Sequence, residues 1–576
     1  MSAAQAPDPQ VLVVGAGPVG LTLAIELASH GLSCRVIDQN EGPTPWSKAQ
    51  LIHARTLEVL HRLGVAEEAI ARGRPLHGLS LFAPGGKKIA HLPFTEIDSP
   101  YPFVLSLAQR DTEALLTARL QALGVVVERQ TRLDRFRQDH DGVSATLVRD
   151  DGEPQTATTR WLVGCDGAHS TVRRQLQVPF EGSTYEQGVI QADARIDWPF
   201  PLAEDEIVTF LAPEGPLAAF PLPGEHRYRL VVVDPPEPWH EPTIGAFQRH
   251  LAERGPAGAV ISEPRWMVGF GFHCRMATAY RVGRIFLAGD AAHIHSPLGG
   301  QGMNLGIQDA HNLAWKLALV ARGRGRPLLL DAYEPERHPV AAAVLRGTDT
   351  ATRAGLFLGR LRNPLAVELR DQLLRLGSGL GVIQERVTRT LSMLDTIYSD
   401  SPIVAQHHAS LLGASIADRG QQERPQVRDW VAFGQGPAPG ARALDVELGD
   451  AAGDGHLFDH LDGGRHTLLL FDGAHDTVDG YRRLGRIAAE VERAYPELVR
   501  PLLVTPRLHL PEGTWWSGPR LHDPDGAVHL RYGARSEALY LIRPDGRVAY
   551  RSQPADETPL LEYLDRILVP GAKGAA

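Results

Sequence analysis

A glycine-rich stretch from residue 289 to residue 304 has the residue types of a loop that binds phosphate groups and a flat ring. An apolar run, Arg284 to Ala288, ends at Gly289-Asp290, and a pattern typical of a long helix begins near Met303. The backbone N–H groups of such a turn are available to a ligand, and a helix start adds about half a positive charge. Three glycines let a backbone lie close to a ligand because they carry no Cβ. A tight connection without a ligand would have the same pattern, so support must come from elsewhere in the chain.

A second glycine motif lies near the N-terminus. Val11 to Val14 is an apolar run, Gly15-Ala-Gly17-Pro-Val-Gly20 follows it, and a helical pattern comes next. A further apolar run ends at Asp38, about 20 residues after the glycines, as in the dinucleotide-binding fingerprint. The first glycine permits the tight turn, the second the approach of a pyrophosphate, and the third close packing of helix on strand. Asp38 is placed to bind ribose hydroxyls.

A third motif is Cys165-Asp-Gly-Ala-His-Ser-Thr-Val-Arg173. An apolar strand pattern ends at Asp166, and Ser170 and Arg173 lie three residues apart at the start of a helical pattern, so their side chains share a face. A basic residue there can bind phosphate, and Asp166 can cap the helix N–H groups. Simple capping without a ligand remains the alternative.

Composition narrows the class of protein. The 576 residues are too many for one hydrophobic core, and a net charge of -9 gives no reason to expect nucleic acid as a partner. The three cysteines, Cys34, Cys165 and Cys274, are far apart and odd in number, which argues against disulfides and a zinc site. The longest apolar run is broken by glycine and proline, so we expect neither a signal peptide nor a membrane span. We therefore expect a cytoplasmic protein, and no metal site.

Two further regions differ in pattern from the glycine motifs. Residues 179 to 280 alternate between apolar and polar, which predicts an inserted antiparallel sheet with one face free to form a pocket. Phe270 and Phe272 share one face of it, and core packing is favoured over stacking on an aromatic ligand. From residue 441 onward a separate α/β unit is expected, and it has no cysteine for dithiol chemistry.

Together the three motifs resemble the single-component FAD-dependent aromatic hydroxylases, in the branch of the phenol and aromatic polyketide hydroxylases. The resemblance covers about residues 10 to 395, and the C-terminal unit is similar to the redox-inactive thioredoxin-like domain of that branch. It implies an α/β fold with a Rossmann-like FAD-binding domain, an inserted antiparallel-sheet substrate domain and a thioredoxin-like domain. The expected divisions are a disordered lead (1–9), an FAD-binding domain (10–178 and 281–395, with 75–105 partly in the substrate domain), a substrate domain (179–280), a connector (396–440) and a thioredoxin-like domain (441–570).

The resemblance also implies which residues bind cofactors. In that family the first motif binds the ADP part of FAD, Asp290 the ribityl and pyrophosphate region, and residues 297 to 304 the flavin ring. Residues 166 to 173 serve both FAD and the nicotinamide cofactor, Gln109 touches the flavin side, and Lys48 stands where most members have arginine. The cofactor-binding residues implied are Gly15, Gly17, Val19, Gly20, Asp38, Gln39, Lys48, Gln109, Asp166, Arg173, Asp290, Pro297, Gly300, Gly302, Met303 and Asn304.

The function implied is hydroxylation of a phenolic or polycyclic aromatic compound, including polyketide natural products. FAD would be reduced by NADPH or NADH and react with O2 to give a C4a-hydroperoxide, and epoxidation or Baeyer–Villiger insertion stays open. No side-chain acid or base is required, and the sequence does not rank His53, His273, His293 and His295 as a phenol base. The protein is expected to be a monomer or homodimer.

Other flavin proteins share parts of this pattern. The tryptophan spacing W-x-W-x-I-P of flavin-dependent halogenases is absent, since Trp515 and Trp516 are adjacent and far downstream. An FAD-dependent dehydrogenase or reductase, or a non-catalytic flavin-binding protein, remains the alternative. The Asp166 to Arg173 motif weighs against the non-catalytic protein.

Overall fold

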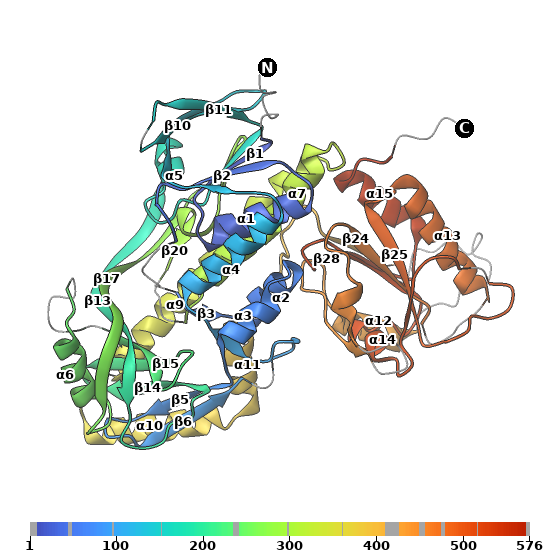
Figure 1. The fold of residues 1–576 in the computed structure, drawn as a ribbon. Coiled ribbons are helices and arrows are strands. Elements are labelled where there is room, and N and C mark those ends of the chain that lie inside the picture. The colour runs from blue at the N-terminus through green and yellow to red at the C-terminus, as the bar shows by residue number, and fades with distance from the viewer. Residues whose placement is uncertain are drawn as a thin grey trace. The chain divides into compact units, whose positions relative to one another are not determined.

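The computed structural model describes residues 9–43, 49–94, 97–150, 152–233, 235, 241–295, 299–359, 361–408, 426–448, 455–473, 478–514 and 516–571. The chain divides into two compact units, shown in Figure 1. Unit 1 comprises Met1–His311 and Arg337–Leu394, and unit 2 comprises Asn312–Glu336 and Asp395–Ala576. The predicted lead, apart from Pro9, lies outside the described residues.

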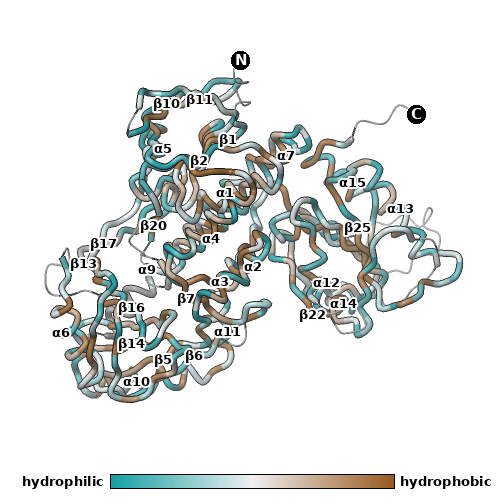
Figure 2. Tube along the Cα trace, viewed as in Figure 1, coloured by the Kyte–Doolittle hydropathy of each residue, from teal (hydrophilic) through white to brown (hydrophobic). Residues whose placement is uncertain are grey.

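The first sheet of unit 1 is six-stranded and parallel except at one edge. In spatial order its strands are β18 (Arg281–Val282), β19 (Ile285–Leu287), β12 (Trp161–Gly164), β1 (Val11–Val14), β2 (Cys34–Ile37) and β8 (Val127–Glu128). The central strands are continuous apolar runs because both faces of the sheet are buried. β1 lies in the brown, hydrophobic part of the scale in Figure 2. Val11 pairs with Trp161 on one side and Cys34 on the other, which brings the carboxyl ends of the glycine-motif strands to one edge.

The second large sheet has eight strands and is antiparallel except where β14 pairs with β5. In spatial order these are β20 (His293–Ile294), β17 (Val260–Ala277), β13 (Phe180–Asp197), β16 (Arg227–Val233), β15 (Gly215–Pro221), β14 (Glu206–Ala212), β5 (Gly78–Phe82) and β6 (Lys88–Pro93). The alternating residues of β13 through β16 bury one face against Phe247 and Leu251 of α6 (Ile244–Arg254). Residues 75–105 thus contribute β5 and β6 to this sheet.

Smaller sheets and helices complete unit 1. The small sheets are β3 (Leu51–Ile52), β7 (Val104–Ser106) and β4 (Arg74–Leu76), and β11 (Gln155–Thr159), β10 (Val143–Arg149) and β9 (Thr131–Gln138). The helices are α1 (Pro18–Ser29), α2 (Ala54–Arg62), α3 (Ala66–Arg72), α4 (Gln109–Ala122), α5 (Thr171–Gln175), η1 (Gly289–Ala291), the start of α7 (Gly302–Ala321), most of α9 (Tyr333–Gly359), α10 (Pro364–Ser378) and α11 (Gly381–Ser392).

Unit 2 is a mixed sheet covered on both faces. Its strands in order are β21 (Ala405–His408), β28 (Val548–Gln553), β27 (Ala538–Ile542), β24 (His466–Phe471), β25 (Val499–Thr505) and β26 (Arg520–His522). Its other elements are α8 (Leu328–Asp331), α12 (Val427–Gln435), β22 (Glu447–Leu448), β23 (Gly455–His456), η3 (Leu457–His460), α13 (Val478–Ala494), α14 (Ala527–Tyr532) and α15 (Glu557–Ile567).

Each face of this sheet has its own apolar core. α13 and α15 cover one face together with Trp315 from the second half of α7, and α12 and α14 cover the other. The segment expected as a connector supplies β21 and α12. No described helix in either unit has the length and apolar character needed to cross a bilayer.

A buried charge network holds the segments of unit 2 together. Glu336 accepts hydrogen bonds from Lys316 Nζ at 2.7 Å and from Arg543 Nη1 at 2.6 Å, and also from Ser401 Oγ at 2.6 Å. Burial alone would raise the pKa of Glu336, but Arg543 and Lys316 lower it to about 2. Because the donors come from α7, β27–β28 and the segment before β21, this carboxylate ties together parts of the chain that are distant in sequence.

We predict that Glu336→Gln lowers the free energy of unfolding by about 3–5 kcal/mol at neutral pH, because buried Lys316 loses the carboxylate it contacts and Arg543 keeps only Asp545 as a partner. The pKa of Glu336 is about 2 when folded against an ordinary value of 4.5. Its contribution is therefore fully present above pH 4.5 and is lost as the pH falls towards 2. Chemical unfolding of both proteins across this range checks the prediction. The exposed Glu492→Gln serves as control, and equal stability of Glu336→Gln and wild type at neutral pH would contradict it.

Candidate functional site

Three loops meet at the carboxyl edge of the first sheet, after β1, β12 and β19. Gly15, with φ +102°, lies so close to the second loop that an added Cβ would be 2.3 Å from Cys165 O. A Cβ on Gly20 would lie 1.9 Å from Gly15 O, so α1 also packs directly on the first turn. No larger residue fits at either position without moving backbone. The first and third glycines of the N-terminal motif therefore serve chain packing, as predicted for Gly20.

The third loop is fixed by a buried carboxylate on α7. Asp309 Oδ2 accepts a hydrogen bond from Gly289 N at 3.0 Å and lies 2.6 Å from His293 Nε2, and Oδ1 accepts from Arg337 Nε at 2.6 Å. Burial alone would raise the pKa of Asp309, but Arg337 and His293 hold it below its usual value. Asp309 is therefore ionised, and the turn that presents Asp290 is held against α7.

The first of two cavities has a volume of about 460 Å³ and lies beside the N-terminal glycine turn. Gly17 lines it, and a Cβ there would meet no protein atom within 4 Å, so the space beside this glycine is open. Asp38 stands at its wall, where its carboxylate accepts hydrogen bonds from Ala16 N at 2.7 Å and Asn40 N at 2.8 Å. Gln39 and the cations Arg129, Arg132 and Arg174 also line this cavity.

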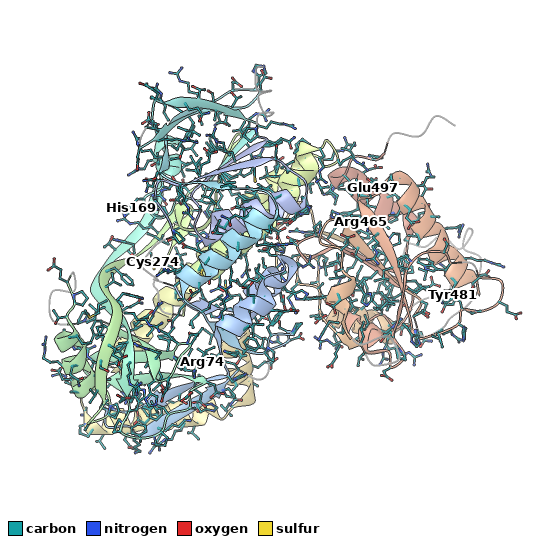
Figure 3. The ribbon with its side chains drawn as sticks, viewed as in Figure 1. Arg74, His169, Cys274, Arg465, Tyr481 and Glu497 are labelled. Carbon is teal, nitrogen blue, oxygen red and sulfur yellow. The ribbon has the colours of Figure 1, made fainter. Side chains whose placement is uncertain are left out.

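The second cavity has a volume of about 680 Å³ and lies between the glycine loop before α7 and the end of the large sheet. The two cavities adjoin, because five residues line both of them. These residues are Gly17, Gln109, Cys165, Gly167 and His169. The second cavity is also lined by Val19, Asp290, Gly300, Gly302 and Met303, by the aromatic rings of Phe180 and Phe270, and by Arg173, Arg275, His273 and His295. Figure 3 labels His169 at this site and Cys274, between His273 and Arg275 on β17.

Asn304 and His53 anchor the loop that borders the second cavity. Asn304 is fully buried, and its Nδ2 donates to Gly300 O at 2.7 Å and Leu51 O at 2.8 Å while its Oδ1 accepts from His53 N at 2.9 Å. His53 Nε2 lies 3.0 Å from Gly299 O and can donate to it in the neutral tautomer. Burial lowers the pKa of His53 to about 4, against the opposing effect of the Gly299 and Gly300 carbonyls. The neutral ring and the amide therefore hold the shape of the loop.

Asp166 and Arg173 connect the second loop to the third. Asp166 Oδ2 accepts from Thr171 N at 2.7 Å and caps α5, and Ser170 Oγ donates to Asp166 Oδ1 at 2.6 Å. Burial raises the pKa of Asp166, and the bond from Ser170 opposes that shift. Arg173 donates to Ala168 O and to Ala291 O, each at 2.8 Å, and its guanidinium lies 3.7 Å from the centre of the Phe180 ring. The capping and phosphate-binding interpretations are thus compatible, because Arg173 also lines the second cavity.

The structure brings most of the predicted residues to these two cavities. Gln109, assigned by resemblance alone, lines both, and its Oε1 accepts from Ala49 N at 3.3 Å. Gly20 and Asn304 line neither and instead support the loops. Lys48 and Pro297 lie outside the described residues.

Sequence reasoning missed several cavity residues, among them His169, Arg275 and Phe180. His169 lies inside the third motif, and Arg275 lies two residues after His273, so a period-two pattern along β17 was the available signal. Phe270 was expected in the core. It packs against the Val189, Val231 and Val233 cluster and also lines the cavity.

This arrangement fits a dinucleotide that carries a flat ring. The first cavity has the open glycine turn, an acid for ribose and cations for phosphate, and the second has a glycine loop at the start of a helix with aromatic walls. The donor set therefore suits FAD, with the adenosine part in the first cavity.

Comparison with known proteins gives the same result. Residues 8–348 match the family model described as the FAD binding domain. The chain is 37% identical to 6-methylpretetramide 4-monooxygenase of Streptomyces rimosus over 588 residues, covering 99% of this chain and 97% of the relative. It is 33% identical to pentachlorophenol 4-monooxygenase of Sphingobium chlorophenolicum, covering 98% of each.

Solved structures of aromatic hydroxylases share the whole fold. Anhydrotetracycline hydroxylase from Streptomyces rimosus matches with a TM-score of 0.70 at 30% identity, covering 98% of this chain and 100% of that chain. A ternary complex of aklavinone-11 hydroxylase with FAD and aklavinone matches with a TM-score of 0.73 at 26% identity, covering 98% and 99%. These matches confirm the predicted mixed α/β fold and the FAD cofactor. The chain belongs to the FAD binding domain family and is an FAD-dependent monooxygenase of the aromatic hydroxylase class.

Proposed function

We propose that this enzyme uses NADPH or NADH and O2 to hydroxylate a phenolic or polycyclic aromatic compound. The observation that carries the proposal is the pair of adjoining cavities, of which the second combines a glycine loop with aromatic and cationic walls. Two relatives are named as monooxygenases of 6-methylpretetramide and of pentachlorophenol, and these names support an aromatic substrate for this chain.

FAD, when bound, supplies the redox chemistry by taking electrons from a nicotinamide cofactor and activating O2. The chain's part is to place and shield it. Gly17 would give the pyrophosphate room to approach, Asp38 would accept hydrogen bonds from the ribose, and Asp290 lines the second cavity together with the loop before α7. The start of α7 at Gly302 favours negative charge on the ring, and Phe180 and Phe270 help keep water out.

The four candidate histidines differ in their placement. His53 and His293 are committed to buried loop contacts, whereas His273 and His295 line the second cavity. Burial lowers the pKa of His273, with Arg275 and His169 adding to the shift, so its ring is neutral and can accept a proton. We therefore rank His273 and His295 as the phenol-base candidates, with no requirement that either act.

The nicotinamide cofactor is proposed to use the cationic wall of the second cavity. His169 and Arg173 come from the third motif and Arg275 from β17, yet all three line the same space, which suits the phosphates of a dinucleotide. Arg275 Nη2 donates to Thr184 Oγ1 at 2.9 Å, so its guanidinium is held in place.

Three domains are proposed to divide this work. The parallel sheet with its glycine loops forms the FAD-binding domain, the eight-stranded sheet the substrate domain, and unit 2 a thioredoxin-like domain without redox cysteines. The order β24, α13, β25, α14, β27, β28, α15 and the spatial order β28-β27-β24-β25 support the thioredoxin-like assignment.

We predict that Gly17→Ala leaves the apoprotein as stable as wild type but weakens FAD binding by about tenfold or more, equivalent to about 1.4 kcal/mol. The new methyl group meets no protein atom within 4 Å and projects towards the space assigned to the pyrophosphate. FAD titration and thermal unfolding of the apoprotein measure the two effects separately. Gly347→Ala, also without a neighbour within 4 Å but in α9, is the control. Unchanged FAD affinity in Gly17→Ala would place the cofactor elsewhere.

Aromatic substrates should accelerate NADPH oxidation by the FAD-loaded enzyme in air, with oxygen appearing in the product. A panel of phenols and polycyclic polyketides, assayed with hydrogen peroxide quantified alongside, identifies a coupled substrate by a high rate with little peroxide. A rate that no aromatic compound changes would contradict the proposed substrate class.

The Arg275→Ala variant should have a KM for NADPH that is about tenfold higher than that of wild type, because one charge-assisted contact to a phosphate is lost. Its FAD content should stay unchanged. Rapid-mixing kinetics of flavin reduction under anaerobic conditions give the measurement. Arg346→Ala, on an exposed part of α9, should behave as wild type. If the flavin of both variants is reduced by NADPH with the wild-type kinetics, the nicotinamide cofactor does not bind at this wall.

A further inference from the structure

Helix α10 carries a row of exposed leucines. The described side chains include thirteen large hydrophobic residues that are exposed, and six of them fall in the short interval from Leu365 to Val382. Soluble monomers expose such residues singly, whereas a contiguous apolar patch marks an interaction surface. More than half of the surface of each helix leucine is accessible to solvent. The exposed fractions are 82% for Leu365, 58% for Leu369, 60% for Leu373 and 70% for Leu376.

The opposite face of α10 already has its partners. Leu374 packs against Ile89 and Ala90 of β6, and Arg370 and Asp371 are buried with Arg370 Nη2 donating to Asp371 Oδ1 at 2.8 Å. In Figure 1 the helix lies alongside β5 and β6. The inner face thus fixes the rotation of the helix, and the leucine row, spaced by four, four and three residues, points away from the sheet.

We propose that the leucine row is the interface of a homodimer in which α10 of two copies pack antiparallel about a twofold axis near Leu373. A twofold interface requires a self-complementary surface. The row meets this requirement, because reversing it about the point between Gln372 and Leu373 brings Leu369 opposite Leu376 and leaves Leu373 of each copy beside the axis. Leu365 at one end is matched by Leu380, exposed by 57%, just beyond the other end of the helix.

The charges beside the row select the antiparallel arrangement. Glu368 and Arg375 are exposed and lie seven residues, about two turns, apart on one flank of α10. In antiparallel packing Glu368 of each copy approaches Arg375 of the other, giving two opposite-charge pairs at the rim. Parallel packing would instead place this flank of each copy beside the opposite flank of the other, so Glu368 and Arg375 would form no such pairs.

The composition of the patch suits a dimer contact. A specific interface buries about 800 Å² on each partner, with an apolar centre and a polar rim. The four helix leucines together with Leu380 and Val382 supply the centre, and Glu368, Gln372 and Arg375 supply the rim. β6 is the edge strand at the far end of the sheet from β20, and no residue of α10 lines either cavity. Dimer formation can therefore be tested without altering the catalytic site.

The test is the mass of the FAD-loaded full chain by light scattering and sedimentation over a range of concentrations. We expect twice the chain mass of 62.7 kDa for wild type. Leu369→Glu should weaken the dimer by about thirtyfold or more, the effect of losing a central anchor, with FAD content and thermal stability unchanged. Leu530→Glu, a matched exposed leucine in α14 of unit 2, should remain dimeric.

A charge swap tests the orientation. Glu368→Arg and Arg375→Glu should each weaken the dimer a few-fold, and the double variant should restore it because the opposite-charge pairs are re-formed. A wild-type monomer at all concentrations, or a dimer that Leu369→Glu leaves intact, overturns the proposal. Failure of the double variant to recover overturns the antiparallel arrangement. Binding of monomeric wild type to vesicles of anionic phospholipid would assign the row to a membrane surface instead.

Discussion

Close approach of backbone to backbone is the constraint on which the cofactor site depends. Gly15 lies against Cys165 O, Gly20 against Gly15 O, and a Cβ on Gly306 of α7 would lie 2.9 Å from Gly289 Cα. The first two loops thus lie in direct contact, α1 packs on the first and α7 on the third, and none of these contacts leaves room for a side chain. Because these contacts fix the loops relative to one another, the two cavities have one defined arrangement, and Gly17 is the position where the glycine leaves open space instead of filling it.

Buried carboxylates on α7 and α9 hold the surrounding helices in the same way. Asp309 is in direct contact with Arg337 and His293 in unit 1, and Glu336 with Lys316 and Arg543 in unit 2. In both cases burial alone would raise the pKa of the carboxylate, and the side chains that contact it lower that pKa. Helix α7 supplies Asn304 and Asp309 to the cofactor loop and Lys316 to the network of unit 2.

The local parts of this site could be predicted from sequence, and the non-local parts could not. The glycine turns and Asp38 follow from strand, turn and helix signals that lie within about 30 residues, the length of one βαβ unit. Arg275 and Phe180 reach the cavity because β13 pairs with β17 over a long register, which no local pattern specifies. For Asn304 the resemblance implied a cofactor contact, whereas the structure shows its side chain turned into the loop. Sequence gives the helical spacing of the α10 leucines, but their exposure depends on which face β6 covers.

The substrate sheet and the cofactor cavity share one chain of buried contacts. Arg229 on β16 is almost fully buried and donates to Asp193 of β13 at 2.7 and 2.9 Å, and Trp266 of β17 donates to the same carboxylate at 2.8 Å. Arg229 also donates to Ala49 O at 3.3 Å, next to the N–H that Gln109 holds at the cavity wall. A shift of these strands relative to the cavity would leave the ion pair intact but break the bond from Arg229 to Ala49 O, so a buried guanidinium would lose one of its acceptors. A direct hydrogen bond therefore joins the sheet that is proposed to bind substrate to the wall that is proposed to bind flavin.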